Sequence, residues 1–302
     1  MDGRDPAELL AEGEAFADLS FWRKIAVSGG DAFAWLNDLV SADISDLGPG
    51  HARRSLLLSP TGRVRAEFTV AVTGEGPLLL QDPLQSEAID DLLARYVLSS
   101  DVTLEDRTQE FTLLAFPGRS DLPHANGAAV SAPSCLGRGF DLLAPESGHD
   151  RLVAGLERTL ALAGGEDVEA WRIRAGIPRF GVDGTPEDLP QECGFEDAIA
   201  FAKGCYLGQE AMAKVRNLGH PRRVLVHLES DQPVSPGQVV TLEGSEIGEI
   251  TGAASLGGRT VVLARVAWDA RRGPFETALG GELRMVVEPP ARQSRSGQAP
   301  AR

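Results

Sequence analysis

Lys203-Gly204-Cys205-Tyr206-Leu207-Gly208-Gln209-Glu210 is the stretch on which the prediction of the fold depends. It places a cysteine behind a lysine and between two glycines, and the residues that follow are good helix formers. Gly219 and Pro221 then supply the stop signal of the predicted helix. Cys205 therefore precedes a helix start, where the helix dipole and Lys203 would both favour a thiolate.

Two interpretations of Cys205 follow from its surroundings. It is either a functional thiol or a structural residue, because free cysteine is among the most buried residue types. Gly204 and Gly208 favour the first, since packing alone rarely requires glycine on both sides. Gln209 and Glu210 are suited to capping the first turn of the helix, and that structural role is sufficient to explain them.

Composition narrows the class of protein. The 302 residues are enough for two or three domains, and the net charge of −15 disfavours direct nucleic-acid binding. The three cysteines, Cys135, Cys193 and Cys205, are far apart, so neither a disulfide framework nor a preformed zinc site is indicated. The acidic N-terminus and the lack of a long apolar run predict a cytoplasmic protein without a membrane segment.

The predicted elements follow in a mixed order rather than as a βαβ repeat, which indicates an α+β protein. Strands at 55–58 and 64–72 form a predicted hairpin, and 150–163 reads as a helix. Beyond residue 222 the pattern changes to short strands separated by turns, which is typical of a small antiparallel barrel or sandwich. The composition of the tail at 291–302 predicts disorder.

Other catalytic signatures are missing from the sequence. It contains no P-loop, no dinucleotide-binding glycine motif, no zinc-hydrolase helix motif and no nucleophile elbow. The five histidines are scattered, so each is expected to be a surface or structural residue rather than a metal ligand. No histidine base completes a Cys–His pair with Cys205 in sequence.

The Lys203 octapeptide resembles the K-G-C-Y-x-G-Q-E signature of the YgfZ-type folate-binding proteins, which are related to the aminomethyltransferase T-protein of the glycine cleavage system. Trp171-Arg-Ile-Arg-Ala-Gly-Ile-Pro-Arg-Phe-Gly-Val-Asp183 is similar to a second family segment. Leu189-Pro-Gln-Glu192 and Leu56-Leu-Leu-Ser-Pro-Thr-Gly-Arg63 extend the likeness. The resemblance covers roughly residues 20–285.

The resemblance implies a three-domain T-protein-like folate-binding fold around a central channel. A discontinuous folate-binding domain would comprise 1–50 and 108–218. An inserted α+β domain would occupy 51–107, and an antiparallel β-barrel would occupy 219–290.

The resemblance also implies folate contacts by Glu67, Arg179, Lys203 and Tyr206. Glu67 is the acid that remains where T-protein relatives carry an acidic pair, a role suited to proton transfer; alternatively it is a solvent-facing strand residue. Arg179 would pair with the glutamate tail of folate or cover the surface, and Tyr206 would stack on the pterin or pack. Arg174 stands where those relatives carry a glutamate that resembles a pterin-recognising carboxylate, and a cation cannot accept pterin N–H groups.

The function implied first is a folate-binding protein that supports iron–sulfur cluster assembly or repair. Cys205 would be its functional thiol and transient iron ligand, with tetrahydrofolate or a derivative as cofactor and iron–sulfur client proteins as partners. A tetrahydrofolate-dependent aminomethyl or one-carbon transferase is the first alternative. A non-catalytic ligand-binding protein with a structural cysteine is the second. The changed carboxylates favour the first function, for which conventional enzyme activity is not expected.

Overall fold

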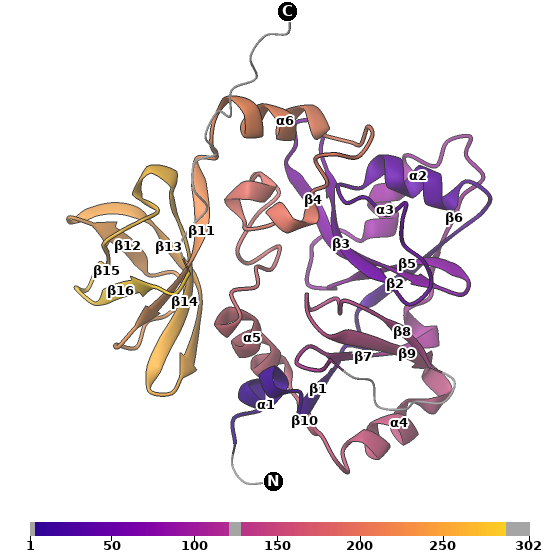
Figure 1. Ribbon diagram of the computed structural model, residues 1–302, viewed down its shortest axis with the longest axis horizontal. Coiled ribbons are helices and arrows are strands. Elements are labelled where there is room, and N and C mark those ends of the chain that lie inside the picture. Colours follow the sequence, from indigo (N-terminus) through magenta and orange to yellow (C-terminus); the bar gives the residue numbers. More distant parts are fainter. Residues whose placement is uncertain (1–3, 121–127, 288–302) are drawn as a thin grey trace, which may run out of the picture.

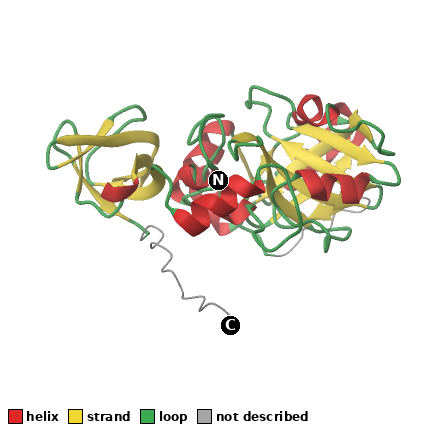
Figure 2. Ribbon diagram, turned by 90° about the horizontal axis from the view of Figure 1, so that it is seen from above, coloured by secondary structure: helices red, strands yellow, loops and turns green. Residues whose placement is uncertain are grey.

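Three sheets form the framework of the protein. The computed structural model describes residues 4–120 and 128–287, and its strands form two five-stranded sheets and one closed barrel (Figure 1). The barrel stands at one end of the molecule and the two open sheets at the other, with helices between them (Figure 2). Mixed helices and sheets with a C-terminal barrel confirm the predicted α+β class.

The first open sheet is antiparallel and has the strand order β3-β4-β5-β2-β6. Its strands are β2 (Arg23–Ser28), β3 (Ala52–Leu58), β4 (Val64–Thr73), β5 (Gly76–Gln81) and β6 (Thr103–Asp106). Helices α2 (Ala32–Leu39) and α3 (Ile89–Ala94) pack their apolar sides against it. The sheet thus begins at residue 23, whereas the predicted inserted domain begins at 51, because backbone hydrogen bonds join β2 to β5 and β6.

The second open sheet is built from strands that precede and follow the strands of the first sheet in the sequence. Its order is β10-β1-β7-β9-β8. Its strands are β1 (Ala15–Asp18), β7 (Phe111–Phe116), β8 (Ala129–Ser131), β9 (Phe140–Pro145) and β10 (Ala161–Ala163), and its helices are α1 (Pro6–Glu12), α4 (His149–Leu156) and α5 (Gly165–Arg174). The predicted helix 150–163 was too long, since residues 161–163 leave the helix and pair in parallel with β1.

The barrel confirms the antiparallel C-terminal domain. Its strands are β11 (Arg223–Ser230), β12 (Val239–Leu242), β13 (Ser245–Leu256), β14 (Arg259–Ala267), β15 (Phe275–Thr277) and β16 (Glu282–Met285), and β16 closes onto β11. Burial alternates along β11, as expected for a strand with one face in the barrel core. The predicted disordered tail at 291–302 lies outside the described residues.

Residues 175–208 run between the open sheets and the barrel and lead into α6 (Gln209–Leu218). Short 3-10 turns occur at η1 (Thr108–Glu110), η2 (Glu146–Gly148), η3 (Pro190–Glu192), η4 (Glu196–Ala198) and η5 (Trp268–Ala270). Ile173 of α5 packs on barrel residues Ala254 and Leu263, which fixes α5 against the barrel. No helix within 4–120 and 128–287 has the length and apolarity needed to cross a membrane.

Candidate functional site

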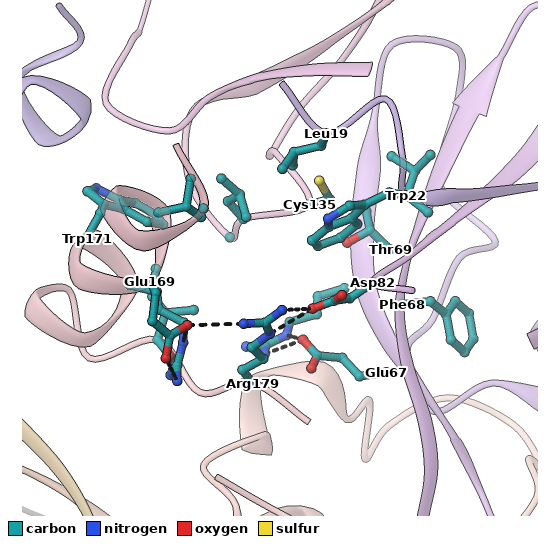
Figure 3. A pocket seen from close by; sticks show the side chains of 18 of the residues that line it. Leu19, Trp22, Glu67, Phe68, Thr69, Asp82, Cys135, Glu169, Trp171 and Arg179 are labelled. Carbon is teal, nitrogen blue, oxygen red and sulfur yellow. Dashed lines mark hydrogen bonds and ion pairs between the residues drawn. The ribbon is translucent and has the colours of Figure 1, made fainter. Parts of the chain in front are cut away.

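A cavity lies where the two open sheets meet α5 (Figure 3). It contains about 900 Å³ of space between atoms, part of it open to solvent. Its lining comes from the turn after β1, from β4 and β5, from a loop at 135–137 and from α5. Segments distant in sequence therefore build one site.

One wall of the cavity is a row of ion pairs. The Arg179 guanidinium lies between two carboxylates: its Nε donates to Asp82 at 2.7 Å and its Nη1 donates to Glu169 at 3.2 Å (Figure 3). The Asp183 carboxylate also fixes the main chain of Arg179, because it accepts a hydrogen bond from the Arg179 backbone N–H at 2.9 Å. Arg179, predicted as a folate residue, therefore lines the cavity, but its charge is already matched by protein carboxylates.

Asp183 also ties the cavity wall to the barrel. Its buried carboxylate pairs with Arg172 at 2.7 Å and accepts a hydrogen bond from the hydroxyl of Thr251 on β13. The Asp183 side chain is 0% exposed and the Arg172 side chain is 6% exposed. Removing Arg172 would leave the Asp183 charge buried without its ion pair, whereas removing Asp183 would leave Arg172 with Glu169 as its carboxylate partner.

Glu67 also lines the cavity, as predicted, but its oxygens are occupied. Oε1 accepts a hydrogen bond from Arg54 Nε at 2.7 Å, and Oε2 accepts one from the Phe180 N–H at 2.9 Å. The side chain of Gln85 holds the backbone of Glu67 in place through both of its amide atoms, at 2.7 and 3.0 Å. Both oxygens of the Glu67 carboxylate therefore already accept hydrogen bonds from the protein, and the carboxylate is held in one position.

The other side of the cavity is largely apolar. Leu19, Trp22, Cys135, Leu136 and Trp171 line it, and Figure 3 shows the Cys135 sulfur on the same side as Leu19 and Trp22. Burial, followed by the charge of Asp141, raises the pKa of the Cys135 thiol well above its ordinary value. This thiol is therefore neutral at physiological pH and adds to the apolar surface.

A buried lysine supports the apolar wall. The Lys24 side chain is fully buried, and its Nζ donates to the carbonyl oxygens of Ser20 at 2.7 Å, Trp22 at 3.0 Å and Thr108 at 3.1 Å. Two of these carbonyls belong to the turn that carries Trp22 into the cavity. Burial lowers the pKa of Lys24 to about 8.

The Lys203 octapeptide lies away from this cavity. Lys203 Nζ donates to the carbonyl oxygens of Asn37 at 2.5 Å, Val40 at 2.8 Å and Ala42 at 2.7 Å, and so holds the C-terminal end of α2. Tyr206 is 8% exposed and packs in a separate apolar cluster. The structure therefore places neither residue in the cavity with Glu67 and Arg179, although sequence reasoning grouped all four as folate ligands.

Cys205 is exposed on the loop between Lys203 and α6. Gly208 of the same loop packs on the tip of the β3–β4 hairpin: a Cβ there would lie 2.6 Å from the Ser59 carbonyl oxygen, and its φ is +83°. Gly204 has open space around it. Gly208 begins α6 without a side-chain cap, so the predicted capping by Gln209 and Glu210 is not seen.

Arg174 does not face the cavity either. Its Nη2 donates to Asp5 Oδ2 at 2.6 Å, at the start of α1. Sequence reasoning missed Arg54, Asp82 and Glu169 as cavity residues. Glu169 had one local signal, since it stands three residues before Arg172, and on a helix such as α5 this spacing favours an ion pair. Arg54 and Asp82 had no such local signal in the sequence.

Comparisons with known proteins agree with this architecture. The family model described as the GCVT N-terminal domain matches residues 7–124. The aminomethyltransferase of Streptomyces avermitilis is 25% identical, with 90% of this chain and 83% of that protein covered. The tRNA-modifying protein YgfZ of Enterobacter sp. is 24% identical, with 88% of this chain and 85% of that protein covered.

A chloroplastic relative from Arabidopsis thaliana is 25% identical over 83% of this chain, and the chain covers 64% of its length. The crystal structure of aminomethyltransferase T from Bartonella henselae shares the fold, with a TM-score of 0.78 at 20% identity; 95% of this chain and 90% of that chain are covered. These matches show that the chain is similar to aminomethyltransferases and to YgfZ, and that it shares the fold of the glycine cleavage system aminomethyltransferase T.

Proposed function

We propose that the protein binds tetrahydrofolate or a derivative in the cavity and supports iron–sulfur cluster assembly or repair through Cys205. The observation that carries the proposal is that the cavity and Cys205 lie apart in the structure. The cavity is lined by apolar side chains and fixed charges, whereas Cys205 is exposed on a loop outside it. A thiol in that position is accessible to a second protein but is not directed at a ligand in the cavity.

The cavity suits a flat, partly polar ligand. Trp22 and Leu136 belong to its apolar lining, and the ion pairs around Arg179 supply its polar wall. Folate combines flat aromatic rings with polar ring edges, and small-molecule sites usually combine apolar walls with a few placed polar groups. Kinship with T-proteins supports the same ligand.

The transferase alternative is supported by the similarity to aminomethyltransferases. A transferase of this kind would need a carboxylate that can exchange protons at the reacting amines. Glu67 is the remaining candidate at that position, and its oxygens are engaged by Arg54 and the Phe180 N–H. The exposure of Cys205 disfavours the second alternative, a non-catalytic ligand-binding protein in which this cysteine is structural.

Any cluster handled by Cys205 would be cargo held together with a partner. Among the described residues, no group of three or more His, Cys, Asp or Glu side chains is arranged to hold a metal ion. Further ligands would come from an iron–sulfur client protein. The Enterobacter relative is named a tRNA-modifying protein. For this chain the net charge of −15 disfavours direct contact with RNA.

Complementation tests the thiol role. We expect Cys205→Ala to abolish rescue of iron–sulfur enzyme activity in cells that lack the protein. Ala202→Ser, at an exposed position of the same loop, is the matched control and should rescue fully. Full rescue by Cys205→Ala would remove the proposed role of the thiol.

Two assays with the purified protein separate folate binding from transfer. Calorimetric titration with tetrahydrofolate should give saturable binding. Incubation with an aminomethyl donor and tetrahydrofolate should give no methylene-tetrahydrofolate, and steady turnover would favour the transferase instead.

A further inference from the structure

Basic side chains gather in the segment that contains Cys205. Residues 201–223 hold five lysines and arginines and a single acid, Glu210, although the whole chain has a net charge of −15. Lys203 is turned inward to main-chain carbonyl oxygens. The other four basic residues are exposed: Lys214, Arg216, Arg222 and Arg223. The surface beside the thiol is therefore cationic on an acidic protein.

These four cations have no carboxylate partner among residues 4–120 and 128–287. Exposed arginines elsewhere do have one: Arg53, Arg259 and Arg284 each lie within ion-pair distance of an aspartate or glutamate. Charges that the fold leaves unpaired add to the field that attracts an oppositely charged surface. Because complementary fields raise the rate of association and select among partners, the four cations favour a partner with an acidic surface.

An aromatic ring adds an apolar contact to this cationic segment. Phe201 is 39% exposed, and the Cζ atom of Arg216 lies 4.5 Å from the centre of its ring. This contact places the start of the Cys205 loop against α6. Aromatic and arginine side chains are enriched at protein interfaces and among the residues that contribute most to binding. The pair therefore has the composition of an interface.

Helix α6 gives the segment an open face. It lies along one edge of the molecule, with the Cys205 loop at one end and the start of β11 at the other (Figure 1). Four residues at helical spacing on it are exposed: Glu210, Ala213, Lys214 and Asn217. Its ten residues span about 15 Å at 1.5 Å per residue. A protein interface of ordinary size is wide enough to include both of its ends.

We propose that this segment is the surface on which an iron–sulfur client protein docks, and that the client presents an acidic face to it. The docking surface comprises Phe201, Cys205, Lys214, Arg216, Arg222 and Arg223. The inference rests on the proposed role of Cys205 and specifies the charge of its partner. Iron–sulfur clusters are held by cysteine thiolates, so a client carries negative charge where it approaches the thiol. The net charge of −15 favours a protein partner over RNA.

Thiol reagents of different charge measure the field at Cys205. Full-length protein reacts with the anionic disulfide dithiobis(nitrobenzoate) and with the neutral disulfide dithiodipyridine, and Cys205→Ala gives the background from the other thiols. The ratio of the two rate constants should fall roughly threefold to tenfold in Lys214→Glu/Arg223→Glu, and also in the wild type at about 1 M salt. An unchanged ratio in the charge-reversed variant would overturn the cationic surface.

Arg151→Glu/Arg158→Glu is the matched control. It makes the same change in net charge at two exposed arginines on and after α4, which lies at the opposite end of the molecule from α6 (Figure 1). Its rate ratio should stay within about twofold of the wild type. An equal fall in both variants would show an effect of net charge alone and would also overturn the surface.

Complementation tests docking itself. In cells that lack the protein, Lys214→Glu/Arg223→Glu should restore less than about a third of the iron–sulfur enzyme activity that the wild type restores, whereas the control should rescue fully. Both side chains are exposed, so the fold should persist; if the variant fails to fold, Lys214→Gln/Arg223→Gln removes the charges without adding acids and should also rescue poorly.

The outcomes separate docking from the thiol role. Full rescue by the charge-reversed variant, with Cys205→Ala inactive, would overturn the docking surface and leave the proposed function standing. Full rescue by Cys205→Ala would overturn the proposed function, and the docking surface with it. Bulk tRNA is the probe for the other class of partner. Saturable tRNA binding that only Lys214→Glu/Arg223→Glu abolishes would assign the surface to RNA and overturn the protein partner.

Discussion

Lys203 is the residue whose role changed most between sequence and structure, and replacing it with methionine tests that change. The family resemblance suggested a folate contact, whereas the structure directs its ammonium to the carbonyl oxygens of Asn37, Val40 and Ala42. Methionine keeps an apolar stem of similar length but cannot donate hydrogen bonds. We therefore expect a loss of stability without a loss of folate affinity.

The magnitude follows from two opposing effects. A hydrogen bond from a charged donor stabilises by roughly 1.5–3 kcal/mol, and Lys203 makes three to main-chain oxygens. Burial lowers its pKa from 10.5 to about 8. At about 1.36 kcal/mol per pKa unit that burial costs up to about 3 kcal/mol, and less where solvent screens the half-buried charge. The difference is about 1.5–6 kcal/mol, and because losses above about 4–5 kcal/mol are exceptional for single substitutions, we expect Lys203→Met to lower the free energy of unfolding by about 2–4 kcal/mol.

Urea denaturation followed by tryptophan fluorescence measures this change, and tetrahydrofolate calorimetry follows on the folded protein. Lys214→Met is the control, because Lys214 is exposed on α6, and it should change stability by less than about 0.5 kcal/mol. An unfolding midpoint of Lys203→Met equal to that of the wild type, together with weaker folate binding, would refute the structural role and restore the ligand role.

Three further changes test other parts of the structure. Gly208→Ala should destabilise the docking of α6 by about 1–3 kcal/mol, because its φ is +83° and the added Cβ meets a backbone oxygen, whereas Gly204→Ala, in open space, should be neutral in thermal unfolding. Asp183→Ala should lower the free energy of unfolding by about 3–5 kcal/mol in urea titrations, since it removes one partner of a buried ion pair; a loss below about 1 kcal/mol would contradict the burial. Hydrogen bonds to Asp18 raise the pKa of His149 above 6.5, so its contribution to stability is complete below pH 6.5 and is lost as pH rises through the raised pKa. The stability difference between the wild type and His149→Asn should therefore be larger at about pH 5.5 than at about pH 8.5, and a pH-independent difference would argue against this pair.

Local sequence patterns predicted those strands and turns whose residue types alone favour the structure that they adopt. The short strands separated by turns after residue 222 predicted a small antiparallel barrel or sandwich, and the structure has the barrel; the hairpin around Ser59 to Gly62 is present between β3 and β4. Patterns failed where a distant partner decides the outcome. Residues 161–163 were read as helix, yet they form β10 because β1 provides an edge with which they pair.

The same distinction applies to the site. The sequence alone predicted the α+β class, an antiparallel barrel or sandwich at the C-terminal end and the resemblance to YgfZ-type proteins, through patterns and motifs whose residues are neighbours in the chain. Only the tertiary structure decided that Glu67, Asp82, Glu169 and Arg179 share one cavity and that Cys205 stands outside it. The physical reason is that each ion-pair partner is selected by the packing of the sheets and α5, which brings Arg179 and Asp82 together across 97 positions in the chain.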